Sequence, residues 1–182
     1  TQGVSSAASD VYKRQVHGLN TVNASTLLMV MALSSMLGGL IYAWLASRIH
    51  SIKRLVLLGS ILSTSIFALL AILPSTNFYL LFLLFLIHGL FGAYPVLIIS
   101  HVRMIVPNVL MGRGLTLSNL FSFGGVGLMQ LISGWVIGNF AVTNGVRTPE
   151  AYSTLFLSVA LISGVAISVY AWIRDPNLKS SA

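Results

Sequence analysis

The chain has 182 residues, of which 56% are hydrophobic and only 7% are charged. A water-soluble domain carries about a quarter charged residues, so this chain has too little polar surface to cover a globule in water. The net charge of +7 does not indicate nucleic-acid binding, because the basic residues lie in small groups between apolar runs and form no recognisable module. The absence of cysteine excludes disulfides, thiolate chemistry and zinc sites built on cysteine.

The first segment of the chain, residues 1–15, is polar. It is too polar to span a membrane, and it lacks the apolar core of a signal peptide. Its letters SSAASDVYKRQ resemble a translated adaptor sequence, so we expect a non-native head; a native disordered tail is the alternative. A transmembrane helical domain is expected over 16–175, followed by a short cytoplasmic tail over 176–182.

Apolar stretches of about 20 residues dominate the rest of the chain, and a helix of that length crosses a bilayer. None of these stretches contains Asp, Glu, Lys or Arg. Because backbone groups in lipid must satisfy their own hydrogen bonds, the sequence predicts an all-α, polytopic membrane helix bundle. Its five expected transmembrane helices are 27–46, 55–73, 78–99, 115–139 and 153–173.

The connections between the spans carry helix-capping and turn residues. Asn77 precedes the third span as a possible cap, and Pro149 suits the first position of the last helix. The longer segment 101–114 is amphipathic. We expect it to lie along the membrane surface before Gly112 and Gly114 turn the chain back.

The basic residues fall mainly on one side of the predicted membrane. That side receives seven of them, whereas the other side receives only Arg147 from the loops. The positive-inside rule therefore predicts that the basic connections and the C-terminus are cytoplasmic. Tyr42 and Trp44, together with Tyr170 and Trp172, suit an aromatic belt at the membrane interface. The seven basic residues are Arg48, Lys53, Arg54, Arg103, Arg113, Arg174 and Lys179.

Small residues recur every four positions in two of the spans. The first span carries Ser35, Gly39 and Ala43, and the fourth carries Gly134 and Gly138. Small residues at this spacing allow another helix backbone to come close, so these positions are predicted to pack helices together. In a transporter the same smooth ridge is also a surface along which helices slide.

Four polar residues of the fourth span, Asn119, Ser122, Gln130 and Ser133, fall on one narrow stripe at about 100° per residue. A polar stripe in lipid faces the protein interior or a water-filled cavity. Two interpretations stay open. The stripe lines a substrate cavity, or it makes hydrogen bonds between helices that are worth about 1 kcal/mol or less each.

The third span combines His88, Gly89, Gly92 and Pro95. Proline removes a backbone hydrogen bond and the glycines permit a bend, so a kink and a candidate hinge are predicted here. His88 is the one conventionally titratable side chain deep in a predicted span. It either relays a proton or binds substrate, or it is a neutral hydrogen-bonded core residue.

Enzyme activity is not expected. No carboxylate pair lies in a span, no P-loop is present, and no serine has a plausible histidine and acid partner. The His and Asp residues are not spaced for a metal site. The sequence therefore predicts no catalytic residue, no metal and no cofactor.

The stretch AWLASRIHSIKR, residues 43–54, resembles the loop motif G-x-L-a-D-R-x-G-R-R/K of the major facilitator superfamily. Ala43 stands at the Gly position, Ser47 stands where Asp is expected, and Arg48 matches. The segment 103–134 is similar to a loop and the penultimate helix of such permeases, and the resemblance covers about 16–173. The candidate gating-loop residues are Ser47, Arg48, Lys53 and Arg54.

The resemblance implies a fragment of a twelve-helix transporter, in which the five spans are most of the C-terminal six-helix half. It implies secondary active transport of a small solute by alternating access in a bacterial inner membrane, with the substrate site between the two halves. His88, Asn119 and Gln130 would lie near that site. In the family the loop Asp helps to latch the cytoplasmic gate, and Ser47 cannot form that charged latch.

The implied partners are the solute, membrane lipid and the missing N-terminal half of the same transporter. The alternative function is a non-transporting, five-span scaffold or assembly subunit.

Overall fold

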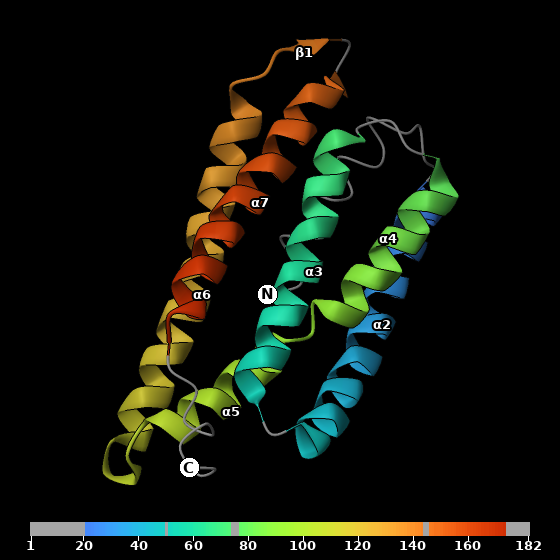
Figure 1. Ribbon diagram of the computed structural model, residues 1–182. Helices are drawn as coiled ribbons and strands as arrows, with labels where there is room; N and C mark the ends of the chain where they lie inside the picture. Colours follow the sequence, from blue (N-terminus) through green and yellow to red (C-terminus); the bar gives the residue numbers. More distant parts are fainter. Residues whose placement is uncertain (1–20, 50, 74–76, 144–145, 174–182) are drawn as a thin grey trace.

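Helices form almost all of the chain that the computed structural model describes, which is residues 21–49, 51–73, 77–143 and 146–173 (Figure 1). The segments 1–15 and 176–182 lie outside these residues. The elements are α2 (Thr21–Arg48), α3 (Ile52–Ile72), α4 (Phe78–Phe91), α5 (Pro95–Ile105), the 3-10 turn η1 (Asn108–Leu110), α6 (Met111–Gly138), β1 (Val142–Thr143), β2 (Val146–Arg147) and α7 (Pro149–Ala171).

Five helical segments of the described chain are long and apolar enough to cross a membrane, which confirms the predicted all-α membrane bundle. Many large apolar side chains on these segments are exposed, among them Met36, Leu131 and Val165. Exposed apolar surface on this scale suits a chain whose outer solvent is lipid. The segments are Ser25–Arg48, Ile52–Ile72, Phe78–Ile105, Asn108–Gly138 and Pro149–Ala171.

Local capping explains where several helices begin. The side chain of Asn77 accepts a hydrogen bond from the backbone N–H of Leu80 at 2.9 Å, as expected for the cap of α4. Ser51 caps α3 in the same way. Pro149 occupies the first turn of α7, where its missing N–H costs nothing. The two-stranded antiparallel hairpin β1–β2 joins α6 to α7.

α2 and α4 lie side by side in close contact (Figure 1). A Cβ at Gly38 of α2 would collide with the carbonyl oxygen of Leu90. A Cβ at Gly89 of α4 would collide with the hydroxyl of Ser34 and would lie 2.6 Å from the carbonyl oxygen of Met31. One glycine on each helix therefore lets the two backbones approach.

The predicted small-residue ridge of α2 lies beside this contact and not in it. A Cβ at Gly39 would meet nothing within 4 Å, and Ala43 is exposed. Ser35 is only partly buried, and its hydroxyl bonds to its own helix. Adjacent positions differ by about 100° around a helix, so the face with Gly38 meets α4 and the ridge points elsewhere. Packing of the ridge against a helix outside the described chain stays a prediction.

The apolar core forms two clusters between the helices. The first lies toward the start of α2 and the end of α3, and the second lies around the junction of α4 and α5. The first cluster contains Leu27, Ile66, Leu70, Leu81, Leu84 and Phe85. The second contains Tyr42, Leu55, Val56, Ala93 and Leu97.

The turn between α5 and α6 is made by Pro107 and η1, so the expectation that Gly112 and Gly114 turn the chain back is wrong. Val106 is extended, with φ −85° and ψ 128°, because a residue that precedes proline is disfavoured in the helical region. Both glycines lie inside α6. Gly114 provides room, since a Cβ there would lie 3.0 Å from the methyl groups of Val106.

We predict that Gly38→Val lowers the free energy of unfolding in detergent by about 1–3 kcal/mol, because the added methyls overpack the contact between α2 and α4. Thermal unfolding followed by circular dichroism measures the loss. Gly39→Val is the matched control and should leave the unfolding temperature nearly unchanged. Equal losses in the two variants would contradict the orientation of α2 described above.

Candidate functional site

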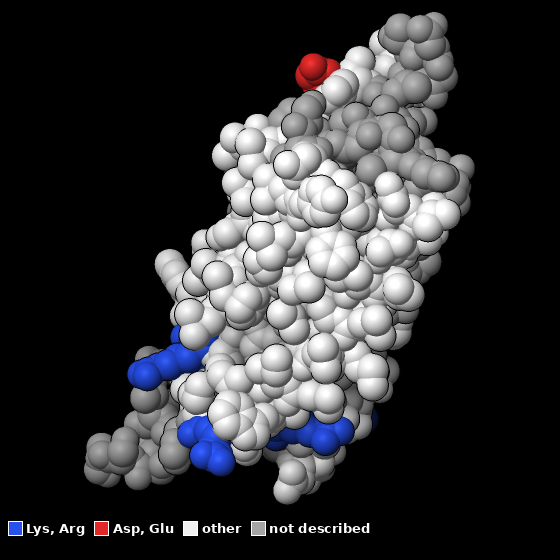
Figure 2. All heavy atoms as spheres, turned by 90° about the vertical axis from the view of Figure 1, so that its right-hand side faces the viewer, with Lys and Arg blue, Asp and Glu red and all other residues white. Residues whose placement is uncertain are grey.

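Basic side chains gather at one end of the bundle, where α2 ends and α3 and α6 begin. Figure 2 shows Lys and Arg at the lower end, an acidic group at the opposite end, and a wide uncharged band between them. An uncharged band between charged ends is what a bilayer requires. We call this end, with Arg48, Lys53, Arg54, Arg103 and Arg113, the basic end.

Lys53 links the start of α3 to the end of α7 by hydrogen bonds. Its Nζ donates hydrogen bonds to the carbonyl oxygens of Ala171, at 2.7 Å, and Ile173. Carbonyls in the last turn of a helix lack partners within the helix, and a cation there also interacts favourably with the helix dipole. Of the four expected gating-loop residues, Lys53 is the one whose side chain makes a described hydrogen bond to another helical segment.

The other gating-loop residues stay close to their own helices. The Ser47 hydroxyl donates to the carbonyl oxygen of Trp44 at 2.7 Å, so it is satisfied within α2. The Arg48 guanidinium lies 5.4 Å from the centre of the Trp44 ring, which is cation–π geometry. Arg54 is exposed. Arg48 and Arg54 therefore face the surroundings of the bundle.

The predicted aromatic belt is only partly present. Trp44 and Trp172 are 59% and 91% exposed at the basic end, as an interfacial position requires. Tyr42 is 6% exposed, so its expected place at the interface is wrong. Tyr170 is half-buried and its hydroxyl points inward. A phenol carries a hydroxyl that can bond inside the bundle as readily as at the interface, and both tyrosines do so.

A second link joins α5 to α7 near the same end. The hydroxyl of Tyr170 and Nδ1 of His101 lie 2.5 Å apart, and His101 is only 3% exposed. Together with Lys53, this pair fixes the last turn of α7 to both α3 and α5. Neither link was predictable from a periodic pattern, because the partners lie 69 and 118 positions apart in the chain.

His88 packs against α3. Its Nδ1 lies 3.3 Å from the hydroxyl of Ser63, which is near the middle of α3. Its ring meets Phe67 edge-on, with 4.7 Å between the ring centres. This placement favours the second interpretation of the sequence, in which His88 is a hydrogen-bonded residue between helices.

The predicted bend of the third span is a complete break in the helix. α4 ends at Phe91, the backbone turns over residues 92–94, and α5 begins at Pro95. The N–H of Gly92 donates to the carbonyl oxygen of His88 at 2.7 Å and ends α4. Beyond the break, α5 runs across the lower end of the bundle toward α6 (Figure 1).

The polar stripe of α6 makes no described hydrogen bond to another helix. The hydroxyls of Ser122 and Ser133 donate to carbonyl oxygens of α6 itself, at 2.8 Å and 2.6 Å. Asn119 is exposed and Gln130 is half-buried. Gly134 and Gly138 on the same helix have open space around the position of a Cβ. Within the described chain the stripe therefore lies on an open surface of α6 and does not form an interface with another helix.

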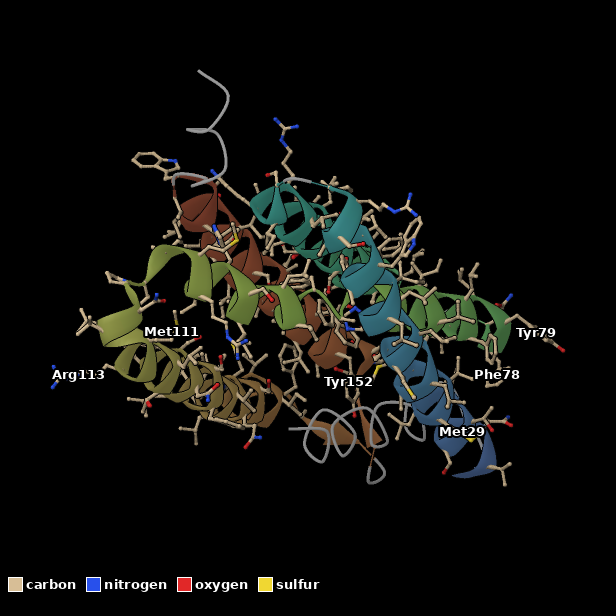
Figure 3. The ribbon with its side chains drawn as sticks, turned by 90° about the horizontal axis from the view of Figure 1, so that it is seen from below. Met29, Phe78, Tyr79, Met111, Arg113 and Tyr152 are labelled. Atoms are coloured by element: carbon tan, nitrogen blue, oxygen red, sulfur yellow. The ribbon has the colours of Figure 1, made fainter. Side chains whose placement is uncertain are left out.

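No described hydrogen bond joins the stripe to His88: His88 pairs with Ser63 of α3, whereas the stripe hydroxyls bond within α6. Seen from below in Figure 3, α6 begins at one edge with Met111 and Arg113, and α4 begins at the opposite edge with Phe78 and Tyr79. In Figure 1, α3 lies between α4 on one side and the pair α6 and α7 on the other. The candidate site residues from the sequence thus form two groups. His88 packs between helices, and the stripe residues lie on the open face of α6.

We predict that Lys53→Met loosens the end of α7 and lowers the free energy of unfolding by about 0.5–1.5 kcal/mol, since two charge-assisted but solvent-screened bonds are lost. A spin label on a cysteine at the exposed Trp172 would report the change as higher mobility in its electron paramagnetic resonance spectrum. Arg54→Met is the control and should leave the label unchanged. A label that stays immobile in Lys53→Met would refute the link.

The sequence model of one family, described as Major Facilitator Superfamily, matches residues 2–182. The match includes all the described helices, and it also runs through most of segment 1–15. A comparison with curated proteins gives no match. The family match agrees with the five apolar helical segments. The chain therefore belongs to the major facilitator superfamily, a family of membrane transporters.

Proposed function

We propose that this chain is part of the C-terminal half of a secondary active transporter, which moves a small solute by alternating access. The family match over residues 2–182 is the observation that carries the proposal. The five spans would be the eighth to twelfth helices of the transporter. In this mechanism two halves rock about a central site, and the solute binds the two states with different affinities.

The open polar stripe of α6 supports the proposal that this helix forms one wall of the solute cavity. A polar stripe exposed to lipid is costly, whereas the same stripe facing water and solute is not. Within the described chain no other helix covers Asn119 or bonds to Gln130. The stripe would form one wall of the cavity, and the N-terminal half would form the other.

The chemistry of that wall suits a neutral solute. Asn119 and Gln130 offer amide groups that both donate and accept hydrogen bonds, and Ser122 and Ser133 add hydroxyls. None of the five predicted spans contains a charged residue that would pair with an ionic solute. His88 would act indirectly, because its contacts hold α4 against α3.

The basic end would face the cytoplasm of a bacterium. Five basic residues lie there, and positive charge is retained on the cytoplasmic side of inner-membrane proteins. Arg48 and Arg54 point outward from α2 and α3, where they would meet the phosphate groups of membrane lipids.

Transport itself is tested with the intact transporter in proteoliposomes. Uptake from a mixture of small metabolites, analysed by mass spectrometry with and without an imposed proton or sodium gradient, should reveal a solute that accumulates. The control is the same lipid without protein. Absence of any gradient-dependent uptake in a folded, intact protein would overturn the proposal in favour of a scaffold or assembly subunit.

We predict that Gln130→Leu weakens binding of that solute by about fivefold to tenfold, which corresponds to one lost hydrogen bond. Gln130→Asn keeps the amide and should lose less. Thr154→Val on α7 is the control, because the Thr154 hydroxyl is exposed and bonds only to its own helix. Wild-type affinity in both Gln130 variants would remove this residue from the cavity.

The orientation predicts the accessibility of single cysteines, which the chain allows because it has none of its own. A cysteine at the exposed Ile49 should react with an impermeant maleimide only from the cytoplasmic side. A cysteine at Glu150, at the opposite end, should react only from outside. The reverse pattern would invert the proposed topology.

A further inference from the structure

The break between α4 and α5 leaves one carbonyl without its ordinary donor. In a continuous helix the N–H of residue 95 would donate to the carbonyl oxygen of Phe91. Pro95 has no N–H, so that bond cannot form. An unsatisfied carbonyl inside an apolar bundle is costly, and the cost rises when lipid replaces water around it.

Tyr42 of α2 supplies the missing donor. Its hydroxyl donates to the carbonyl oxygen of Phe91 at 3.1 Å, across 49 positions of sequence. Three N–H groups beside the break have other acceptors: Gly92 donates to His88, Val96 to Ala93 and Leu97 to Tyr94. The bond from Tyr42 is therefore the one described hydrogen bond that replaces what Pro95 removes.

α3 leaves room for this hydroxyl. A Cβ at Gly59 would collide with the Tyr42 hydroxyl and would lie 2.7 Å from Cβ of Tyr94. Gly59 is buried, and Tyr42 packs in the same core cluster as Ala93 and Leu97 on either side of Pro95. Three helices thus converge on a single carbonyl at the break.

The contact between α2 and α4 determines which residue of α4 lies beside Tyr42. Gly38 rests on the backbone of Leu90, and Tyr42 lies one helical turn further along the same face of α2. The Tyr42 ring therefore reaches the residue that follows Leu90, which is Phe91. This register places the Tyr42 hydroxyl beside the carbonyl oxygen of Phe91.

We propose that Tyr42 is the positioning residue of this break, and that its bond to Phe91 fixes the angle between α4 and α5. α5 swings relative to α4 only when the bond opens. Because α5 leads through Pro107 into α6, the bond also restrains the start of the helix that carries the polar stripe. The last point rests on the proposed transport function, whereas the fixed angle does not.

The angle is measurable by pulsed electron paramagnetic resonance on the full chain in lipid nanodiscs. Spin labels on cysteines at the exposed positions Leu83 of α4 and Met104 of α5 report the distance across the break. Tyr42→Phe removes only the hydroxyl. It should raise the population of other angles, relative to the wild-type angle, by about threefold to tenfold, as expected for one lost hydrogen bond.

A second substitution makes the test specific. Pro95→Ala restores the N–H of residue 95, which then bonds to Phe91 within the helix. In a Pro95→Ala background, Tyr42→Phe should therefore leave the distance distribution unchanged. Tyr79→Phe is the matched control, because Tyr79 is 82% exposed at the far end of α4, and it should have no effect in either background.

Two results would overturn the proposal. One is a wild-type distance distribution in Tyr42→Phe. The other is an equal broadening by Tyr42→Phe with Pro95 and with Ala at this position, because the hydroxyl would then act independently of the missing N–H. The measurement needs no solute, so its outcome is separate from the outcome of the transport assay.

Discussion

Lipid offers no hydrogen-bond partner to a protein backbone, and this constraint explains most of the architecture. Inside each helix of the described chain the backbone N–H and C=O groups pair with one another. Exceptions arise where a helix stops, and there side chains from distant segments complete the bonding. Tyr42 donates to the carbonyl of Phe91 at the break in the third span. Lys53 donates to the last carbonyls of α7. Tyr42 and Lys53 thus act where the backbone bonding of a helix is interrupted, whereas most serine and threonine hydroxyls of the described chain bond to their own helix.

The same constraint separates positions that pack helices together from positions on an open helix surface. α2, α3 and α4 meet through glycines and buried serines, and His88 belongs to that contact because it bonds to Ser63. α6 keeps its polar stripe on an open surface, with its hydroxyls bonded to its own backbone. The placement of His88 and His101 between helices and of the polar stripe on an open face of α6 is compatible with the proposed cavity wall.

Much of the fold is predictable because hydropathy, helix length and capping act locally. The apolar runs predicted the spans and Asn77 predicted a helix start, whereas Pro95 predicted a kink where the structure has a break between two helices. The contact face of α2 was not predictable, since Gly38 and Gly39 are both small and differ only by about 100° of rotation. The links made by Tyr42 and Lys53 were missed for a related reason: each depends on how two distant helices are aligned. The same holds for the candidate site residues. The polar stripe of α6 was predictable from the sequence, but the packing of His88 against α3 was not, because it depends on how two helices are aligned.

The central claim is that lipid is the solvent of this chain. Membranes that contain it, washed with alkaline carbonate and then extracted with mild detergent, test the claim directly. The chain should stay with the membranes during the wash, remain monodisperse in detergent, and aggregate when the detergent is removed. A folded chain that sediments as a single monodisperse species in plain buffer would contradict the account.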